Sequence, residues 1–451
     1  MITNFELENF KSFSGKQSLR FAPITLIFGP NSSGKSSVIQ SLMMLKQTIL
    51  SNTKNAELVT SGDSIDLGTF DSLVHAQDIK RNIKFSIQYN TNHDAQEFIQ
   101  KNSFPMLFGN KFLRKIDFCY RKSNDISFLD SYSFSCNDGN SEKISFELNN
   151  PVKSSVGITY RLQNPDSLRS VISKKQKLKP DDLNGWSNLD NSLSNSFKLS
   201  SNINLPTSFS EDTSDLSQYI DKTLIDVKHV FDSMKYLGPL RSSPKKYYSS
   251  DIGNYQKGQG KNNLGLAIYN ADNETRLKLE TFMLNFNIPY KIDAVNLGDI
   301  NTGQLISIQL KDLRNNAVVT PKDVGFGIGQ VLPIILESVV SKNNLICVEQ
   351  PEIHLHPKLQ AHLADLFIDS VTSGHNQWIV ETHSEAIMLR IQRRIRERKI
   401  SHDLISVLYI DVGESGAQVT SIGLDDEGDF TAHWPNGFFE ERLNEMCGIE
   451  S

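Results

Sequence analysis

The segment Gly29–Ser36 has the residue types and the spacing of a phosphate-binding loop. Its sequence, Gly-Pro-Asn-Ser-Ser-Gly-Lys-Ser, matches G-x-x-x-x-G-K-[ST] at every defined position. Glycines let the backbone curl so that its N–H groups point at phosphate oxygens, and a following helix directs its positive end at the same anion. Lys35 would reach the β- and γ-phosphates, and Ser36 would offer its hydroxyl to Mg²⁺. The residues predicted to bind a nucleoside triphosphate here are Gly29, Pro30, Asn31, Ser32, Ser33, Gly34, Lys35, Ser36 and Ser37.

Such a loop also needs a carboxylate that holds the metal ion or its water, and Leu345–Glu349 supplies one. Four apolar residues followed by an acid are typical of a buried strand with a carboxylate at its tip. A solvated acid at a strand end is the common alternative, but the loop at Gly29–Ser36 favours a metal ligand. Ser36 and Glu349 are therefore the predicted metal ligands.

Two further segments have polar groups that a triphosphate site uses. Trp378–Glu381 is expected to be a strand, and Thr-His-Ser follows it, so that His383 can donate a hydrogen bond to the γ-phosphate or position the attacking water. Gly325–Gln330 is a glycine-rich turn before an apolar segment, and such a turn opening a helix forms an anion site. The alternatives are a histidine satisfied within the fold and an ordinary helix N-terminus. The second turn would bind nucleotide through Gly327, Gly329 and Gln330.

The elements around these segments alternate between strand and helix. Ile24–Phe28 is a short β-rich apolar run directly before the loop, and Val38–Leu50 has helical length and composition. Nearer the C-terminus the predicted strands and helices are, in order, Asn344–Glu349, Pro357–Ser370, Trp378–Glu381, Ser384–Arg398 and Ile405–Ile410. This alternation favours an α/β fold with a mostly parallel sheet.

Residues 76–235 differ in composition from the chain on either side. Short, partly alternating apolar runs separated by Asn, Ser and Lys predict an antiparallel, β-rich insertion. The polar stretch 163–215 is expected to be a long lid, and Leu216–Met234 has helical spacing. The predicted domains are thus 1–75 and 236–451, as two parts of one nucleotide-binding head, with 76–235 inserted between them.

The composition excludes several classes of protein. Of the 451 residues, 47 are Lys or Arg and 52 are Asp or Glu, giving a formal net charge of −5 (47 − 52), whereas a protein that coats nucleic acid is strongly basic. No apolar run approaches the roughly 18–20 residues of a membrane span, and the N-terminus lacks a signal-peptide pattern. The 4 cysteines lack the spacing of a disulfide framework or a metal site. These features predict a cytoplasmic protein without a membrane partner.

The order of phosphate-binding loop, glycine-rich turn, acid-tipped strand and histidine-tipped strand resembles that of ABC-type ATPase heads. The signature of those heads is close to Leu-Ser-Gly-Gly-Gln, and Phe326–Gln330 is a divergent form of it. Pro351–Pro357 and Glu381–Ser384 are similar to the SMC-like and OLD-like (overcoming lysogenization defect) branch. The resemblance implies ATP and Mg²⁺ as cofactors. It also implies a head-to-tail dimer or higher homo-oligomer, in which the signature of one copy closes over ATP on the other.

Two motifs narrow the resemblance to a bacterial subgroup. They are Tyr236–Arg241 (Tyr-Leu-Gly-Pro-Leu-Arg) and Trp434–Glu441 (Trp-Pro-Asn-Gly-Phe-Phe-Glu-Glu). Members of that subgroup occur as ATPase subunits of antiphage systems such as Septu (PtuA), and with some retrons. OLD-type nucleases continue into a nuclease domain of roughly 100 residues or more, but only 68 residues (451 − 383) follow His383. The resemblance therefore implies a separate nuclease subunit of HNH type. The motif leaves open whether Arg241 faces nucleotide, DNA or a neighbouring subunit.

One position departs from the family pattern. ABC heads usually have Asp-Glu after the apolar strand, a metal-side acid and then a general base, whereas this chain has Glu349 and Gln350. Gln350 cannot accept a proton, although it can orient water as the switch glutamine of small GTPases does. Glu352 is then the candidate base, and slow hydrolysis is expected. The predicted catalytic residues are Lys35, Glu349, Gln350, Glu352 and His383.

Three functions remain open on the sequence. The first is an ABC-type ATPase that regulates a partner nuclease in antiphage defence. The second is an SMC-like DNA-repair or chromosome ATPase that acts on DNA directly, although the long heptad runs of those proteins are missing. The third, a transporter subunit, leaves the β-rich insertion and the C-terminal tail without a use.

Several surface segments allow two interpretations. The cations of Arg390–Lys399 and Lys174–Lys179 can contact DNA phosphates, but solvated faces or salt bridges between subunits are favoured. The acids of Asp425–Asp429 are expected to form a solvated turn. Trp434 and Phe438–Phe439 are expected to pack the C-terminal tail onto the head, with docking of a partner as the alternative.

Overall fold

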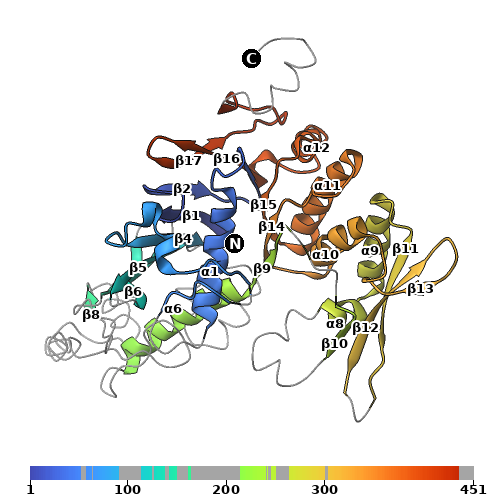
Figure 1. Ribbon diagram of the computed structural model, residues 1–451, viewed down its shortest axis with the longest axis horizontal. Coiled ribbons are helices and arrows are strands. Elements are labelled where there is room, and N and C mark those ends of the chain that lie inside the picture. Colours follow the sequence, from blue (N-terminus) through green and yellow to red (C-terminus); the bar gives the residue numbers. More distant parts are fainter. Residues whose placement is uncertain are drawn as a thin grey trace. The chain divides into compact units, whose positions relative to one another are not determined.

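The computed structural model describes two compact units of the chain (Figure 1). The first comprises Met1–Phe21, Pro30–Met234 and Ile410–Ser421, and the second comprises Ala22–Gly29, Lys235–Tyr409 and Ile422–Ser451. The described residues are 1–51, 57–62, 64–90, 113–123, 126–137, 142–149, 161–163, 214–239, 241, 245–249, 264–299 and 303–435. Most of the predicted lid, the lysines of Lys174–Lys179 and the pair Phe438–Phe439 lie outside them.

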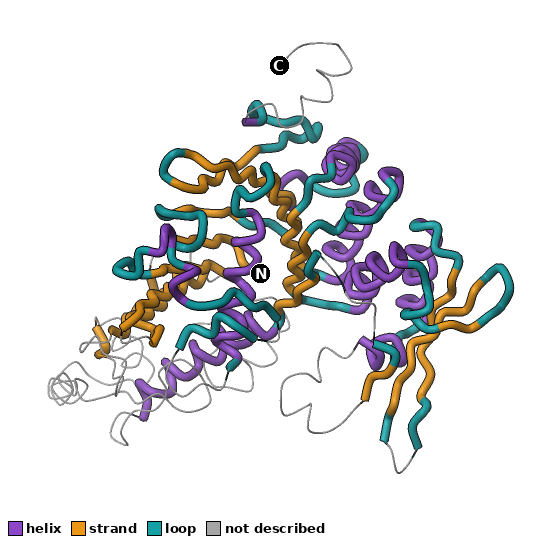
Figure 2. The backbone as a smooth tube through the Cα atoms, viewed as in Figure 1, coloured by secondary structure: helices purple, strands orange, loops and turns teal. Residues whose placement is uncertain are grey.

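A seven-stranded antiparallel sheet is the framework of the first unit (Figure 2). Its strand order is β2-β1-β4-β5-β6-β7-β8. The strands are β1 (Ile2–Glu8), β2 (Gln17–Arg20), β4 (Ile83–Tyr89), β5 (Leu113–Ser123), β6 (Ile126–Asn137), β7 (Glu142–Asn149) and β8 (Arg161–Gln163). Because β4 pairs with β1, the sheet continues across residue 76, where the sequence predicts the insertion to begin.

One face of this sheet is buried beneath a helix. In β5 every second side chain from Arg114 to Tyr120 is buried, as the two-residue period of a strand requires. The helix α6 (Ser214–Asp232) packs on this face, and its Phe231 ring lies 6.5 Å from the ring of Phe118. α6 also packs against α1 (Lys35–Leu50), the helix after the phosphate-binding loop, while the short α2 (Phe70–Leu73) follows it in the chain. The helix predicted near Leu216–Met234 is confirmed.

A mostly parallel sheet is the centre of the second unit. Its parallel neighbours, in spatial order, are β16 (Ile405–Gly413), β3 (Ile24–Phe28), β15 (Gln377–Glu381) and β14 (Leu345–Glu349). β9 (Met234–Leu237) lies beside β14, and β16 continues into the first unit, where β17 (Gly416–Ile422) pairs with it. Every residue of β3, β14 and β15 is buried, as expected of parallel strands covered on both faces.

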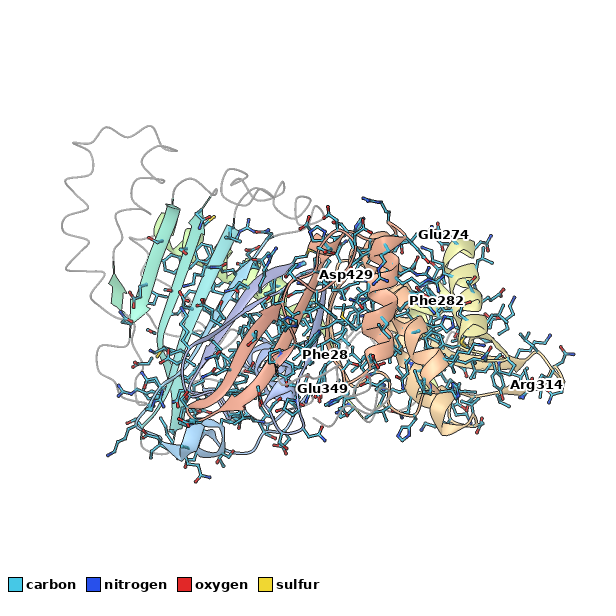
Figure 3. The ribbon with its side chains drawn as sticks, turned by 90° about the horizontal axis from the view of Figure 1, so that it is seen from above. Phe28, Glu274, Phe282, Arg314, Glu349 and Asp429 are labelled. Carbon is cyan, nitrogen blue, oxygen red and sulfur yellow. The ribbon has the colours of Figure 1, made fainter. Side chains whose placement is uncertain are left out.

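Three helices and an antiparallel lobe complete the second unit. The helices are α10 (Phe326–Val340), α11 (Pro357–Gly374) and α12 (Glu385–Arg396). The lobe consists of β10 (Tyr247–Ser249), α8 (Leu264–Tyr269), α9 (Asn273–Asn285), β11 (Tyr290–Asn296), β12 (Leu305–Asp312) and β13 (Val318–Val319). In Figure 3, Arg314 lies at the outer end of this lobe, whereas Phe28 and Glu349 lie in the parallel sheet. The predicted α/β fold with a mostly parallel sheet is confirmed.

A single hydrophobic core joins the lobe to the parallel sheet. It includes Phe282 of α9, Ile308 of β12 and Ile346 of β14. The sequence predicts none of the lobe's elements individually, since β10, α8 and β13 have only 3, 6 and 2 residues and are too short for a periodic pattern. The lobe is ordered by this shared core rather than by local pattern.

Trp434 closes the core near the end of the described chain. Its ring packs edge-on against Phe28, Phe430 and Tyr409, with ring centroids 5.5, 5.1 and 6.0 Å away. The expected packing of Trp434 onto the head is therefore confirmed.

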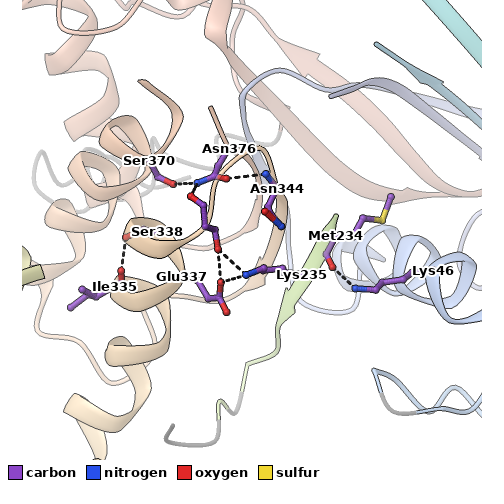
Figure 4. Close-up of polar contacts among 10 residues, drawn as sticks. Lys46, Met234, Lys235, Ile335, Glu337, Ser338, Asn344, Ser370 and Asn376 are labelled. Atoms are coloured by element: carbon purple, nitrogen blue, oxygen red, sulfur yellow. Dashed lines mark hydrogen bonds and ion pairs between the residues drawn. The ribbon is translucent and has the colours of Figure 1, made fainter. Parts of the chain in front are cut away.

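A buried asparagine holds together the beginnings of β14 and β15 (Figure 4). Asn376 is fully buried, and its amide nitrogen donates to the Ser341 carbonyl at 2.7 Å and to the Ser370 hydroxyl at 2.9 Å. Its carbonyl oxygen accepts from the Asn344 amide at 2.9 Å. Asn376 therefore ties the end of α10 to α11 and to the start of β14.

We predict that Asn376→Leu lowers the melting temperature of the protein. An apolar side chain of similar size would remove the three hydrogen bonds of Asn376, and a buried polar group that is left unsatisfied costs about 1–3 kcal/mol. The measurement is thermal unfolding followed by circular dichroism, with the exposed Ser373→Ala as the control. Equal melting temperatures for Asn376→Leu and the wild type would contradict the proposed tie.

Candidate nucleotide-binding site

The phosphate-binding loop connects β3 to α1, as the sequence predicts. β3 ends at Phe28 and α1 begins at Lys35, three residues earlier than the predicted start at Val38. Lys35 and Ser36 therefore lie in the first turn of the helix, where backbone N–H groups have no partner within the helix. The Lys35 side chain is 4% exposed, and its Nζ donates to the Pro30 carbonyl at 2.6 Å. The lysine thus closes back over its own loop.

Gly34 is required by the backbone at the start of this helix. It is the N-cap residue, with φ of 103° in the left-handed region that L-residues avoid. A Cβ at this position would lie 2.2 Å from the Ser12 hydroxyl and 3.4 Å from the Phe13 ring. The second glycine of the motif is therefore fixed both by conformation and by space.

The loop also fits a bound triphosphate. The Ser33 hydroxyl is fully buried, and it has no hydrogen-bond partner in the described part of the chain. A buried hydroxyl without a partner costs free energy, and a phosphate oxygen is the acceptor that would restore the bond. The Ser36 hydroxyl of the first unit and the Glu349 carboxylate of the second unit are each of the oxygen type that Mg²⁺ prefers.

The acid-tipped strand is β14, and its terminal carboxylate is held by a tyrosine. Glu349 is 5% exposed, and its Oε1 accepts a hydrogen bond from the Tyr236 hydroxyl at 3.0 Å. Burial, together with the charges of Glu349 and Glu381, raises the pKa of Tyr236, so the tyrosine stays a donor. Glu381 stands opposite Glu349 in the register of β15 and β14. Neither Tyr236 nor Glu381 is predicted as a site residue.

Gln350 adopts a conformation that is unusual for its residue type. Its φ is 44°, in the left-handed region, and its backbone N–H donates to the Glu381 carbonyl at 2.8 Å. Left-handed residues other than glycine and asparagine concentrate at functional sites, where the surrounding structure holds them. The position that departs from the family pattern is thus held in a tight turn directly after the strand.

Glu352 and His383 come together at the edge of the parallel sheet. The His383 amide donates to Glu352 Oε1 at 2.7 Å. Burial raises the pKa of Glu352, opposed by this hydrogen bond and by the Thr382 hydroxyl. The predicted base therefore has a pKa above the ordinary carboxyl value. Behind His383, the Ser384 hydroxyl caps α12 by accepting from the Ile387 amide.

The glycine-rich segment is part of a helix rather than a turn before one. α10 begins at Phe326 with Gly325 as its N-cap, and the Gly329 amide donates to the Gly325 carbonyl at 3.1 Å. Gly327 faces the loop after β14, since a Cβ on it would lie 3.5 Å from the His354 carbonyl. Gln330 is buried, and its side-chain amide bonds to the main chain of Arg241.

The predicted site residues are divided equally between the two units. Pro30–Ser37 belong to the first unit, and the second unit contains Gly29, Gly327, Gly329, Gln330, Glu349, Gln350, Glu352 and His383. Sequence reasoning missed the roles of Tyr236 and Arg241, although it singled out the motif that contains them. Spacing alone cannot show that these two side chains fold back onto the end of β14.

The match to a family model decides which family the chain belongs to. Residues 1–388 match the model described as AAA ATPase domain. The chain is a member of this AAA ATPase family. The phosphate-binding loop and the acid-tipped strand of this AAA ATPase both lie within the matched residues. No curated protein matches the chain.

Solved structures similar to this AAA ATPase include heads of SMC proteins. An SMC head bound to the C-terminal winged-helix domain of ScpA is 15% identical, with a TM-score of 0.45 over 94% of this chain and 98% of that one. The SMC head from Thermotoga maritima is 11% identical, with a TM-score of 0.38 over 94% and 99%. An SMC head with an extended coiled coil, in a complex from Pyrococcus furiosus, is 12% identical, with a TM-score of 0.43 over 100% and 99%. These resemblances are distant, and the family assignment rests on the family model.

The arginines of α12 are paired within the chain. Arg390 and Arg394 both contact Asp365 of α11 at 2.6 Å, and Arg394 also contacts Glu397. The other pairs are Arg393 with Glu397 and Arg396 with Asp429. Four arginines of this segment therefore form salt bridges within the chain.

Asp425 caps the acidic turn by accepting from the amides of Glu427 and Asp429. The described residues contain no group of three or more His, Cys, Asp or Glu side chains that could hold a metal ion. Cys119, Cys136 and Cys347 form no disulfide in the part of the chain that the structure describes, and Cys447 lies outside that part. Among the helices that are described, none combines the length and the apolar character needed to span a membrane.

We predict that Gly34→Ala weakens ATP binding about tenfold, because a left-handed alanine costs about 1–2 kcal/mol even without a clash. Binding is measured by titration with a fluorescent ATP analogue. Gly15→Ala is the matched control, since a Cβ there meets nothing within 4 Å. Adding Ser12→Ala to Gly34→Ala should restore part of the affinity by removing the nearest atom. Unchanged affinity in Gly34→Ala would show that the loop does not need this conformation.

We predict that Glu352→Gln stabilises the protein at neutral pH. The amide keeps an oxygen for the His383 N–H but has no charge to bury. Because the pKa of Glu352 is raised by folding, the wild type loses stability as pH rises from the ordinary carboxyl value through the folded pKa. The advantage of Glu352→Gln should therefore vanish below about pH 4 and be largest above the folded pKa. Melting temperatures across this pH range test the sign, and a constant difference would contradict it.

Proposed function

We propose that this AAA ATPase binds ATP with Mg²⁺, closes head to tail with a second copy around the nucleotide, and hydrolyses it slowly to regulate an HNH-type nuclease in antiphage defence. The observation that supports this proposal best is the end of β14. There Tyr236 holds the acid Glu349, and Gln350 stands where related ATPases have a general base. A site that is built for the metal but lacks this carboxylate suits a nucleotide sensor.

Each predicted residue has a role that its environment supports. Lys35 would exchange the Pro30 carbonyl for the β- and γ-phosphates, and the first turn of α1 would complement their charge. Bound ATP supplies the phosphoryl group that is transferred to water. Gln350 would orient this water, Glu352 would accept its proton, and His383 would donate to the γ-phosphate.

We infer self-association from the number of nucleotide-binding elements in one chain. The described chain has one phosphate-binding loop and one glycine-rich helix start, so a nucleotide enclosed by both elements head to tail needs two copies. The proposed domain division assigns 1–75 and 236–451 to the head and 76–235 to an insertion. The ion pairs of the α12 arginines weigh against this helix as a DNA-binding surface, which makes the nuclease regulator the better supported function.

The proposed function is tested by the rate of phosphate release in variants and by the mass of the particle that the protein forms. We expect Gln350→Glu to raise phosphate release by roughly 10²-fold, because a carboxylate there can accept the proton of the attacking water and general-base catalysis contributes at least this much. Lys35→Ala should abolish both binding and hydrolysis, and the exposed Gln418→Glu is the matched control.

Mass photometry of Glu352→Gln, in which hydrolysis is blocked, should show a dimer with ATP and a monomer without it. A particle that stays monomeric with ATP would refute the closed dimer. The complex purified from its native operon should cut DNA at a rate that depends on ATP. A complex that contains no nuclease, or one whose nuclease ignores ATP, would remove the defence role.

A further inference from the structure

A buried arginine connects the start of α10 to the end of β14. Arg241 is 5% exposed, and it forms no ion pair with any carboxylate of the described chain. Its guanidinium donates instead to four backbone carbonyls. The acceptors are Gln330 at 2.9 Å, Gly238 at 3.0 Å, Glu349 at 3.0 Å and Gln350 at 3.3 Å. A charge in this environment is tolerated only because so many carbonyl dipoles point at it.

The main chain of Arg241 is fixed in addition to its side chain. Its amide donates to Gln330 Oε1 at 3.0 Å, and its carbonyl accepts from Gln330 Nε2 at 2.6 Å. Gln330 therefore holds both polar groups of this residue from the second turn of α10. Burial lowers the pKa of Arg241 to about 10, so the side chain is still charged at neutral pH. We call this set of bonds among Gly238, Arg241, Gln330, Glu349 and Gln350 the arginine clamp.

Two features of the clamp bear on the site. The Gln350 carbonyl that Arg241 bonds also accepts from the Ile353 amide, which closes the left-handed turn at Gln350. In addition, Gly327 lies against the His354 carbonyl, so the first turn of α10 packs on the loop that follows this turn. The clamp thus fixes both the water-orienting residue and the glycine-rich helix start.

We propose that Arg241 is a positioning residue that makes the start of α10 and the end of β14 move as one block. The inference rests on the proposed function, in which Glu349 and Gln350 act on ATP bound by their own chain while Gly327 and Gly329 close over ATP bound by the partner. The clamp then couples the two nucleotides of the dimer. ATP binding at one site shifts the end of β14. The clamp transmits this shift to the start of α10, which closes over the other site.

The first experiment measures this coupling in the full-length protein. Wild type should hydrolyse ATP with a Hill coefficient clearly above 1. Arg241→Met removes the four side-chain bonds but keeps an unbranched, flexible side chain, and it should lower the Hill coefficient to about 1 with at least a tenfold loss of kcat.

Two further variants separate positioning from simple stabilisation. Arg241→Lys keeps the charge but lacks the planar fork that reaches several carbonyls, so it should recover melting temperature without recovering cooperativity. Gln330→Leu breaks the clamp from the helix side and carries the test if Arg241→Met does not fold. Arg276→Met is the matched control, because Arg276 bonds the Ala271 and Tyr269 carbonyls and Asp293 in the antiparallel lobe of the same unit.

A second experiment tests the clamp independently of the dimer. Hydrogen exchange without nucleotide should become faster in Arg241→Met both at the start of α10 and at the end of β14, but not in the Arg276→Met control. Faster exchange at only one of these segments overturns the clamp. A folded Arg241→Met with the wild-type Hill coefficient also overturns it. If wild type shows neither dimer nor hydrolysis, the proposed function fails while the exchange result still decides the clamp.

Discussion

The parallel register of β3, β15 and β14 is the constraint on which the site of the second unit depends. Glu349 stands opposite Glu381, and Glu381 stands opposite Ile27. Because the strands are parallel, all three end at one edge of the sheet, the edge at which open α/β sheets bind their ligands. The chain leaves this edge into the phosphate-binding loop, into the Gln350 turn and into His383. The buried apolar residues of these strands therefore position the polar residues that follow them.

Several polar groups at this edge of the sheet have their own hydrogen-bond partners. The Tyr236 hydroxyl bonds Glu349, the His383 amide bonds Glu352, and backbone carbonyls surround the Arg241 guanidinium. A buried polar group without a hydrogen-bond partner costs free energy. This network therefore favours the observed arrangement of these segments over alternative arrangements. The same reasoning explains why Asn376, at the opposite ends of β14 and β15, bonds three separate segments.

Gly34 and Gln350 both have a left-handed backbone, but they differ in whether the position can hold a side chain. At Gly34, a side chain would collide with Ser12, so the residue type is dictated by space as well as by φ. At Gln350 a side chain is tolerated, and the turn is held by hydrogen bonds to the Glu381 carbonyl and from Arg241 and Ile353. The first kind is visible as a glycine in a motif. The second kind leaves no trace in the residue type, because glutamine rarely adopts this conformation.

The sequence by itself determined the parts whose physics is local. The loop Gly29–Ser36, the apolar run that ends in Glu349 and the helix near Leu216–Met234 follow from spacing and period, and the structure has each of them. Only the tertiary structure decided what Tyr236, Arg241 and Gln330 do, because all of their partners named above, except Gly238, lie 89 to 113 residues away along the chain. It also decided the lobe formed by α8, α9 and β10–β13, whose short mixed segments become ordered only by burial in a core shared with the parallel sheet.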